Sequence, residues 1–288
     1  MRVWGWVHRH RIEALCLLGA VAYLAIFIVL PYANVVVFSF WEKELYSIQP
    51  AFSLDNFARA LGNDLYLSVI LNSLQVAAAV TLASSLLGYL LAYYLAVHAH
   101  HWRNLLFFLL IVPLWTSFLL RAYIWKIILG RNGILNSLLM EAGLLDQPAS
   151  FLLYNKFSIA LALTYIFLPF VALPVYAALE KIPQRYLEAS ADLGAPAFAT
   201  FRHVVFPLTL PGLIAGATVV FCLAFGDFIT PALLGGSGDI MIANVIISQF
   251  GAAYDWPFGS ALALLVVAIV LAIVGLSTRL AKLDGGRA

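Results

Sequence analysis

The residues of this sequence best placed to do chemistry lie in one polar segment, between Glu180 and Pro207. If residues 184–192 form a helix, four polar side chains share one side of it: Gln184, Arg185, Glu188 and Asp192. Glu188 and Asp192 are like charges four positions apart, which mildly destabilises an isolated helix. The arrangement is easier to understand if another protein supplies the cations that pair with them. We therefore expect the segment to bind a partner protein, and a solvated amphipathic loop is the alternative.

Proline and glycine residues give this segment a predicted shape. Pro183 suits a first helical turn and Gly194 suits the left-handed position that closes a helix. About ten residues then form a helix roughly 15 Å long, which is too short to cross a membrane. Pro196 opens a second short helix that Pro207 ends, with four apolar side chains on one face: Phe198, Phe201, Val204 and Val205. We predict a short helix-turn-helix.

A second group of candidates consists of ionisable residues inside apolar blocks. Such side chains are costly to bury in lipid, so each is a functional candidate by default. Asp227 could meet an ammonium group of a substrate, or it could cap a helix near the loop opened by Pro231. Arg121 could reach the lipid headgroups or pair with Asp227.

Three aromatic residues lie near Arg121 in the sequence: Trp115, Tyr123 and Trp125. Ring faces attract ammonium groups, so these side chains could form a surface for a cation. They could equally belong to the aromatic belt found where a membrane meets water. We keep Trp115, Arg121, Tyr123 and Asp227 as candidates for a substrate pathway.

Enzyme chemistry is not expected in this chain. A polytopic membrane enzyme would need a nucleophile with a neighbouring base, or a cluster of His, Asp or Glu ligands. The sequence shows neither arrangement. A G-x-x-x-x-G-K-[ST] loop, which would cradle the phosphates of ATP, is absent from the sequence. Cys16 and Cys222 are far apart in apolar blocks, so neither a disulfide nor a metal site is expected.

The composition predicts that lipid surrounds most of the chain. Hydrophobic residues make up 64% of the 288 residues and charged residues only 10%, and the mean hydropathy is +0.97. A water-soluble protein does not have this composition. The net charge of +2 gives no reason to expect binding to nucleic acid.

Six apolar blocks reach the roughly 20 residues that a spanning helix needs, which predicts an all-α membrane protein. They are Ala14–Phe40, Tyr66–Val97, Leu105–Leu129, Phe157–Leu179, Leu208–Leu234 and Phe258–Leu280. Lys and Arg residues divide ten against six between the two sides of these blocks, which predicts that both termini lie in the cytoplasm. We expect one transmembrane domain at residues 14–282, cytoplasmic tails at 1–13 and 283–288, and a cytoplasmic loop at 180–207.

The loop at residues 180–207 resembles the EAA motif of the permease subunits of ABC importers. The matching residues are Glu188-Ala189-Ser190, Gly194 after three residues, Val204 after nine more, and Pro207. Two positions depart mildly from the motif, with Ser190 in place of the second alanine and Phe206 in place of the usual leucine. The spacing is otherwise that of the family.

Two further blocks are similar to the permeases of spermidine and putrescine importers, at residues 113–139 and from Asp255 onwards. The similarity covers roughly residues 60–280. That subfamily is mixed and includes importers of opine-type substrates. The resemblance therefore implies a polyamine or related cationic amine as substrate, with an opine or amino-acid-like molecule as the alternative.

The resemblance also implies how the chain would work. In such permeases the loop forms a coupling helix that fits a groove of a separate ATPase, and here the coupling residues would be Arg185, Glu188, Ala189, Ser190, Asp192 and Gly194. Two ATPase copies would bind ATP and Mg²⁺, so this chain needs no cofactor. A periplasmic binding protein would deliver the substrate, and a second, usually different, permease would complete the channel in the bacterial inner membrane.

The main alternative is a secondary transporter driven by an ion gradient. Such a protein predicts several acids within the membrane, or broken helices in matching positions of two halves. Asp227 is the one serious candidate for such an acid in this sequence.

Overall fold

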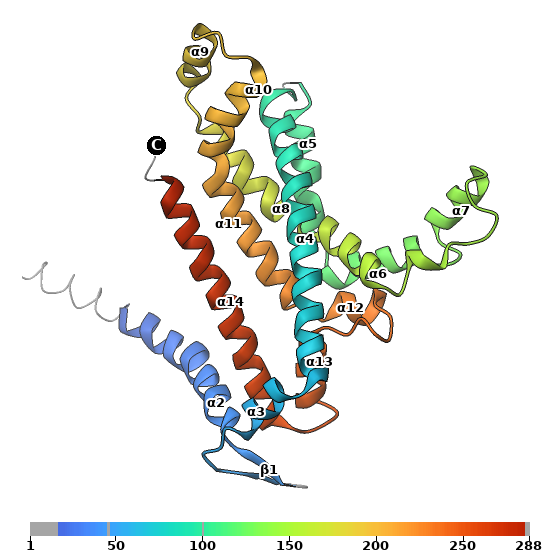
Figure 1. Cartoon of the computed structure of the whole chain (residues 1–288), viewed down its shortest axis with the longest axis vertical. Helices are drawn as coiled ribbons and strands as arrows, with labels where there is room; N and C mark the ends of the chain where they lie inside the picture. The colour runs from blue at the N-terminus through green and yellow to red at the C-terminus, as the bar shows by residue number, and fades with distance from the viewer. Residues whose placement is uncertain (1–16, 45–46, 100, 286–288) are drawn as a thin grey trace, which may run out of the picture. The chain divides into compact units, whose positions relative to one another are not determined.

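The computed structural model describes residues 17–44, 47–99 and 101–285 (Figure 1). Apart from one two-stranded hairpin, the regular structure of these residues is helical. The predicted tail at residues 1–13 lies outside the described residues. At the other end, α14 (Trp256–Gly285) continues past residue 282 into the predicted C-terminal tail.

Internal contacts divide the chain into two compact units. One consists of Met1–Asn63 with Ile246–Ala268, and the other of Asp64–Val245 with Ile269–Ala288. Each unit therefore has its own packing. The single transmembrane domain expected at residues 14–282 stays a prediction.

Five helical segments are each long and apolar enough to cross a membrane. They are Leu17–Ser39, Asp64–Val97, Lys156–Glu180, Ala197–Phe225 and Trp256–Arg279. A sixth span exists if two segments bent by 102°, Arg103–Trp115 and Phe118–Glu141, count as one. The predicted all-α class with six spans is confirmed on that count.

The bend falls inside the predicted span Leu105–Leu129. The elements there are α5 (Arg103–Ile111), a 3-10 turn η2 (Val112–Trp115), α6 (Phe118–Leu129) and α7 (Ile134–Glu141), followed by a second 3-10 turn, η3 (Ser150–Leu152). Pro113 has no N–H to continue the helical bonding, and Thr116 and Ser117 are extended, with ψ of 152° and 137°. The prediction of one unbroken helix over Leu105–Leu129 was wrong because hydropathy alone does not register this break.

Three long helices form the core of the second unit (Figure 1): α4 (Asp64–Val97), α8 (Lys156–Glu180) and α11 (Phe206–Phe225). Glycines let α11 approach the backbone of α8. A Cβ added at Gly212 would lie 2.8 Å from the carbonyl oxygen of Pro174, and one at Gly216 would lie 2.8 Å from that of Phe170. This is the small-xxx-small pattern of closely packed membrane helices.

The start of α8 is fixed by a reciprocal cap. The Asn155 side chain accepts a hydrogen bond from the Ser158 N–H at 3.0 Å, and the Ser158 hydroxyl accepts one from the Asn155 N–H at 3.3 Å. Two of the N–H groups left open at the helix start are thereby satisfied. The cap places the first residue of α8 one position before the predicted span.

The helical segment after the loop starts and ends earlier than predicted. It combines α10 (Ala197–Thr200), a π-helical turn η4 (Phe201–Val205) and α11. The sequence predicted that Pro207 ends the second short helix, and this prediction was wrong. Pro207 lies in the first turn of α11, directly after the π turn in which the Phe206 N–H bonds to the Phe201 carbonyl and shifts the bonding by one residue. The segment stops at Phe225, so the predicted span at residues 208–234 was wrong at both ends.

In the described part of the first unit, the helical segment Leu17–Ser39 comes first. The elements of this part of the unit are η1 (Ala25–Val29), α2 (Leu30–Ser39), β1 (Glu42–Glu44), β2 (Ser47–Gln49) and α3 (Asp55–Gly62). The strands pair antiparallel, with Lys43 opposite Ile48. The sequence did not predict this hairpin.

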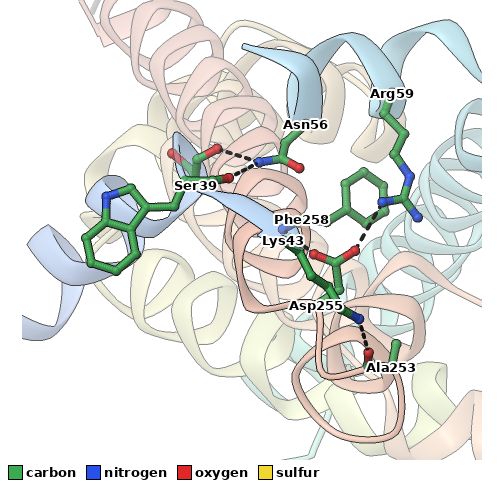
Figure 2. A network of polar contacts seen from close by, with 8 residues as sticks. Ser39, Lys43, Asn56, Arg59, Ala253, Asp255 and Phe258 are labelled. Carbon is green, nitrogen blue, oxygen red and sulfur yellow. Dashed lines mark hydrogen bonds and ion pairs between the residues drawn. The ribbon is translucent and has the colours of Figure 1, made fainter. Parts of the chain in front are cut away.

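Polar contacts connect the elements of this unit (Figure 2). The Arg59 guanidinium pairs with the Asp255 carboxylate at 3.1 Å and lies 4.0 Å from the centre of the Phe258 ring. The other Asp255 oxygen accepts the Phe258 N–H at 3.2 Å and so caps the start of α14. The Lys43 ammonium donates to the Ala253 carbonyl at 2.5 Å. These contacts hold β1 and α3 against the loop before α14.

Candidate functional site

The predicted coupling loop contains one short, sharply ended helix, α9 (Gln184–Asp192). Pro183 stands directly before it with an extended backbone, at its N-cap instead of in its first turn. Gly194 follows with φ of +74°, and its N–H bonds to the Ala191 carbonyl at 2.8 Å. The Ala195 N–H bonds to the Ser190 carbonyl at 3.1 Å, which completes a Schellman motif. The predicted left-handed turn at Gly194 is confirmed.

A pair of hydroxyl groups joins α9 to α10. Ser190, which is buried, lies 2.8 Å from Thr200, oxygen to oxygen. Ser190 is also the residue that departs from the two alanines of the EAA motif. The sequence pattern did not indicate a partner for this serine, and Thr200 was not among the candidate residues. A hydroxyl ten positions away in the sequence becomes its neighbour because the chain reverses at Gly194.

The outer face of α9 combines charge with exposed apolar side chains. Arg185, Glu188 and Asp192 are exposed, and among the described residues neither acid has an ion-pair partner. Leu193 is 87% exposed and Phe198 is 72% exposed on the same short loop. Apolar surface next to unpaired charge is typical of a protein interaction site.

A cavity of about 480 Å³ lies behind α9, on the side facing the membrane helices. Its walls are mostly apolar and include Leu187 and Ala191 of α9, Tyr93 and Val97 of α4, and Leu179 of α8. Among the described residues, the side-chain hydrogen bond that joins α9 to another element is that of Ser190 with Thr200. Sparse packing of this kind allows a segment to shift at low cost.

The structure places Asp227 at the start of α12 (Ile229–Leu234). Its buried carboxylate accepts the N–H groups of Ile229 at 3.3 Å and Thr230 at 3.0 Å. This is the geometry of a helix cap, the structural alternative considered for this residue. Contact between Asp227 and a substrate stays a prediction.

Arg121 points to the backbone of α8. Its guanidinium donates to the Ile166 carbonyl at 3.4 Å and lies 5.8 Å from the centre of the Phe118 ring. Among the described residues no ion pair joins Arg121 to Asp227, so the pairing considered from the sequence is not formed here.

The two aromatic candidates lie on opposite sides of the bend in the third span. Trp115 ends the 3-10 turn and stands edge-to-face with Phe108 of α5, at 6.2 Å between ring centres. Tyr123 lies on α6, where the Lys126 ammonium is 5.9 Å from its ring centre. In the described part of the chain no hydrogen bond, ion pair or ring contact joins Trp115 or Tyr123 to Asp227. The substrate pathway through these candidates stays a prediction.

Residues 65–282 match the family described as "binding-protein-dependent transport system inner membrane component". The chain belongs to this family. This permease is 40% identical over 264 residues to the spermidine/putrescine transport system permease protein PotB of Escherichia coli (strain K12), with 90% of this chain and 95% of the relative covered. It is 36% identical over 265 residues to the protein of the same name from Haemophilus influenzae, with 91% of each chain covered.

The permease fold is also found in a crystal structure of a bacterial ABC transporter involved in the import of the acidic polysaccharide alginate. The TM-score is 0.73 over 98% of this chain and 99% of the other, at 18% sequence identity. At that identity the likeness concerns the fold alone.

Membership of the family shows what kind of subunit this chain is. The chain is a multi-pass subunit of the inner membrane and is not itself catalytic. An importer of this class works with an ATPase and a binding protein. The ABC importer permease expected from the EAA motif is confirmed.

Proposed function

We propose that this permease carries spermidine, putrescine or a related small cationic amine. The observation that carries the proposal is the similarity to PotB of Escherichia coli over 90% of this chain. The name of that relative gives spermidine and putrescine as its cargo. An opine or amino-acid-like substrate is the competing candidate.

We propose that α9 is the part of the chain that receives the motion of the ATPase. Glu188 and Asp192 are exposed on it without cationic partners among the described residues, so an ATPase groove with basic side chains would complement them. Leu193 and Phe198 would supply the apolar part of the same contact. Arg185, Ala189, Ser190 and Gly194 complete the proposed coupling surface, with Ser190 and Gly194 acting through the shape of the loop.

We further propose a heterodimeric permease in which this chain provides one transmembrane domain, residues 14–282. The importers that it resembles usually pair two different permeases. Side chains of the first spanning segment support an additional neighbour, because nearly all of them are exposed in the isolated chain. Lipid and a second permease would share that surface.

The substrate is tested with the complete importer in liposomes, with the binding protein added outside. Uptake of labelled spermidine and putrescine is measured with an opine and a neutral amino acid as competitors. We expect ATP-dependent uptake of at least one polyamine, unaffected by an excess of the competitors. Uptake of the opine in place of both polyamines would refute the proposed substrate.

The coupling role is tested in the same liposomes with Glu188→Ala. We expect the variant to lose ATP hydrolysis stimulated by the loaded binding protein, because α9 no longer carries its central charge. Glu141→Ala, at the exposed end of α7, is the matched control for loss of one carboxylate. Full stimulation in Glu188→Ala would exclude the coupling role of that residue.

A further inference from the structure

Three side chains form a closed polar network between α5 and α8. The Arg103 Nε donates to the Tyr176 hydroxyl at 2.5 Å, and that hydroxyl donates to Glu180 Oε1 at 3.0 Å. A second nitrogen of Arg103 forms an ion pair with the same Glu180 oxygen. The guanidinium carbon also lies 5.3 Å from the centre of the Tyr176 ring. Each of the three residues therefore contacts the other two.

The network lies at the base of the coupling helix. Glu180 is the last residue of α8, and α9 begins four positions later at Gln184. Arg103 is the first residue of α5, the first arm of the bent span. The network therefore connects the root of α9 to a membrane segment that α9 itself does not contact through any described hydrogen bond, ion pair or ring contact.

A second contact joins the same two parts beyond the bend. Arg121 of α6 donates to the Ile166 carbonyl of α8 at 3.4 Å. Between the two arginines, the rings of Phe107 and Tyr176 lie 5.2 Å apart. The bent span is thus attached to α8 at two levels, one on each arm.

We propose that Arg103, Tyr176 and Glu180 are positioning residues that make the bent span follow α8 when the ATPase displaces α9. The proposal rests on the coupling role proposed for α9, but not on the identity of the substrate. A fork of charge-assisted hydrogen bonds fixes direction as well as distance, so a displacement of the end of α8 is passed to α5 as a displacement of the same sense. Because α6 follows α5 directly after the bend, the displacement of α5 also moves α6.

Exposure of the charged pair means that removing it should not unfold the protein. The Arg103 and Glu180 side chains are 39% and 46% exposed, and ion pairs at such positions contribute little to folding stability. Tyr176 is buried and holds the hydroxyl between them. Variants of the two charged residues should therefore fold and assemble, so a change in transport reports on coupling.

The first test measures substrate uptake per ATP hydrolysed in the reconstituted importer. Arg103→Lys keeps the positive charge at this end of the membrane but cannot contact both partners as a fork. We expect Arg103→Lys and Glu180→Gln to lower uptake per ATP about fivefold or more, the scale of a typical coupling free energy. The double variant Arg103→Glu with Glu180→Arg should recover part of the loss. Arg279→Ala, which removes one positive charge near the end of α14, is the control and should leave the ratio unchanged.

The second test does not depend on which substrate is carried. Spin labels are placed at Leu109 of α5 and Leu90 of α4, both exposed, after Cys16 and Cys222 are replaced by serine. The label distance should change when ATP is added to the importer, and the change should disappear in Arg103→Lys. An unchanged uptake ratio in Arg103→Lys, an equal loss in Arg279→Ala, or an ATP-dependent distance change that survives Arg103→Lys would overturn the proposal. Absence of polyamine uptake in the unmodified importer would instead refute the proposed substrate alone.

Discussion

The hydroxyl oxygens of Ser190 and Thr200 lie 2.8 Å apart, on the two sides of the turn that Gly194 makes. The contact joins the end of α9 to the helical segment Ala197–Phe225 that follows it. A side-chain hydrogen bond therefore connects the two helices in addition to the backbone. The shape of the loop proposed for coupling thus depends on the residue that departs from the EAA motif.

Ser190→Ala restores the usual alanine of the motif but removes this bond. We expect a loss of about 0.5–1.5 kcal/mol in local stability, the usual net value of one hydrogen bond. Limited proteolysis of residues 190–200 should become several-fold faster, while substrate-stimulated ATP hydrolysis falls only modestly. Thr278→Ala, which removes a hydroxyl that donates to the Gly275 carbonyl within α14, is the control. Equal proteolysis of both variants would show that the Ser190 contact does not order the loop.

Gly194→Ala tests the left-handed turn separately from the space around it. An added Cβ would meet nothing within 4 Å, but the φ of +74° is unfavourable for alanine by about 1–2 kcal/mol. We expect weaker stimulation of ATP hydrolysis because α9 is presented at a different angle.

The control for this substitution is Gly275→Ala in α14, where an added Cβ also meets nothing within 4 Å and φ is not positive. That variant should keep full stimulation. If Gly194→Ala and Gly275→Ala behave alike, the turn at Gly194 does not set the coupling geometry.

The features that the sequence could predict are those that depend on local chemistry. Burial in lipid requires long apolar helices, so hydropathy located α4 to within two residues of its start, at Asp64 instead of Tyr66. The turn at Gly194 was predictable because few residues other than glycine accept its backbone angles.

Other features depend on contacts between distant residues and left no signal in the sequence. Arg103 could be interpreted only as a charge that orients the chain, since its partner Tyr176 is 73 positions away. Pro113, where the helix breaks, lies inside one continuous apolar block of the sequence, so hydropathy did not indicate a break there. The helix cap at Asp227, by contrast, is local, with the N–H groups of Ile229 and Thr230 as donors, and the sequence offered it as one of two alternatives.

Gly216→Ala should destabilise the contact between α11 and α8. The new Cβ would lie 2.8 Å from the Phe170 carbonyl oxygen and 2.8 Å from the Val171 Cα, both backbone atoms. Such overpacking costs about 1–3 kcal/mol, so we expect a lower midpoint of thermal unfolding in detergent. Gly226→Ala, where the nearest atom would be 3.4 Å away, is the control. A midpoint unchanged in Gly216→Ala would show that the two helices can separate without cost.

Asp227→Asn and Asp227→Ala distinguish a helix cap from a substrate contact. Asparagine caps a helix about as well as aspartate, whereas alanine loses about 0.5–2 kcal/mol. An asparagine oxygen can still accept the Thr230 N–H at 3.0 Å, but the amide nitrogen cannot accept the longer bond from Ile229 at 3.3 Å. We therefore expect Asp227→Asn to lower the unfolding midpoint only slightly and to keep its uptake of amine, and Asp227→Ala to unfold at a clearly lower temperature. Asp239→Asn controls for the loss of one carboxylate, because Asp239 also accepts a backbone N–H, from Gly236 at 3.2 Å. If Asp227→Asn alone loses uptake while its midpoint falls only slightly, the negative charge is needed for transport, and Asp227 belongs to the path of the cation.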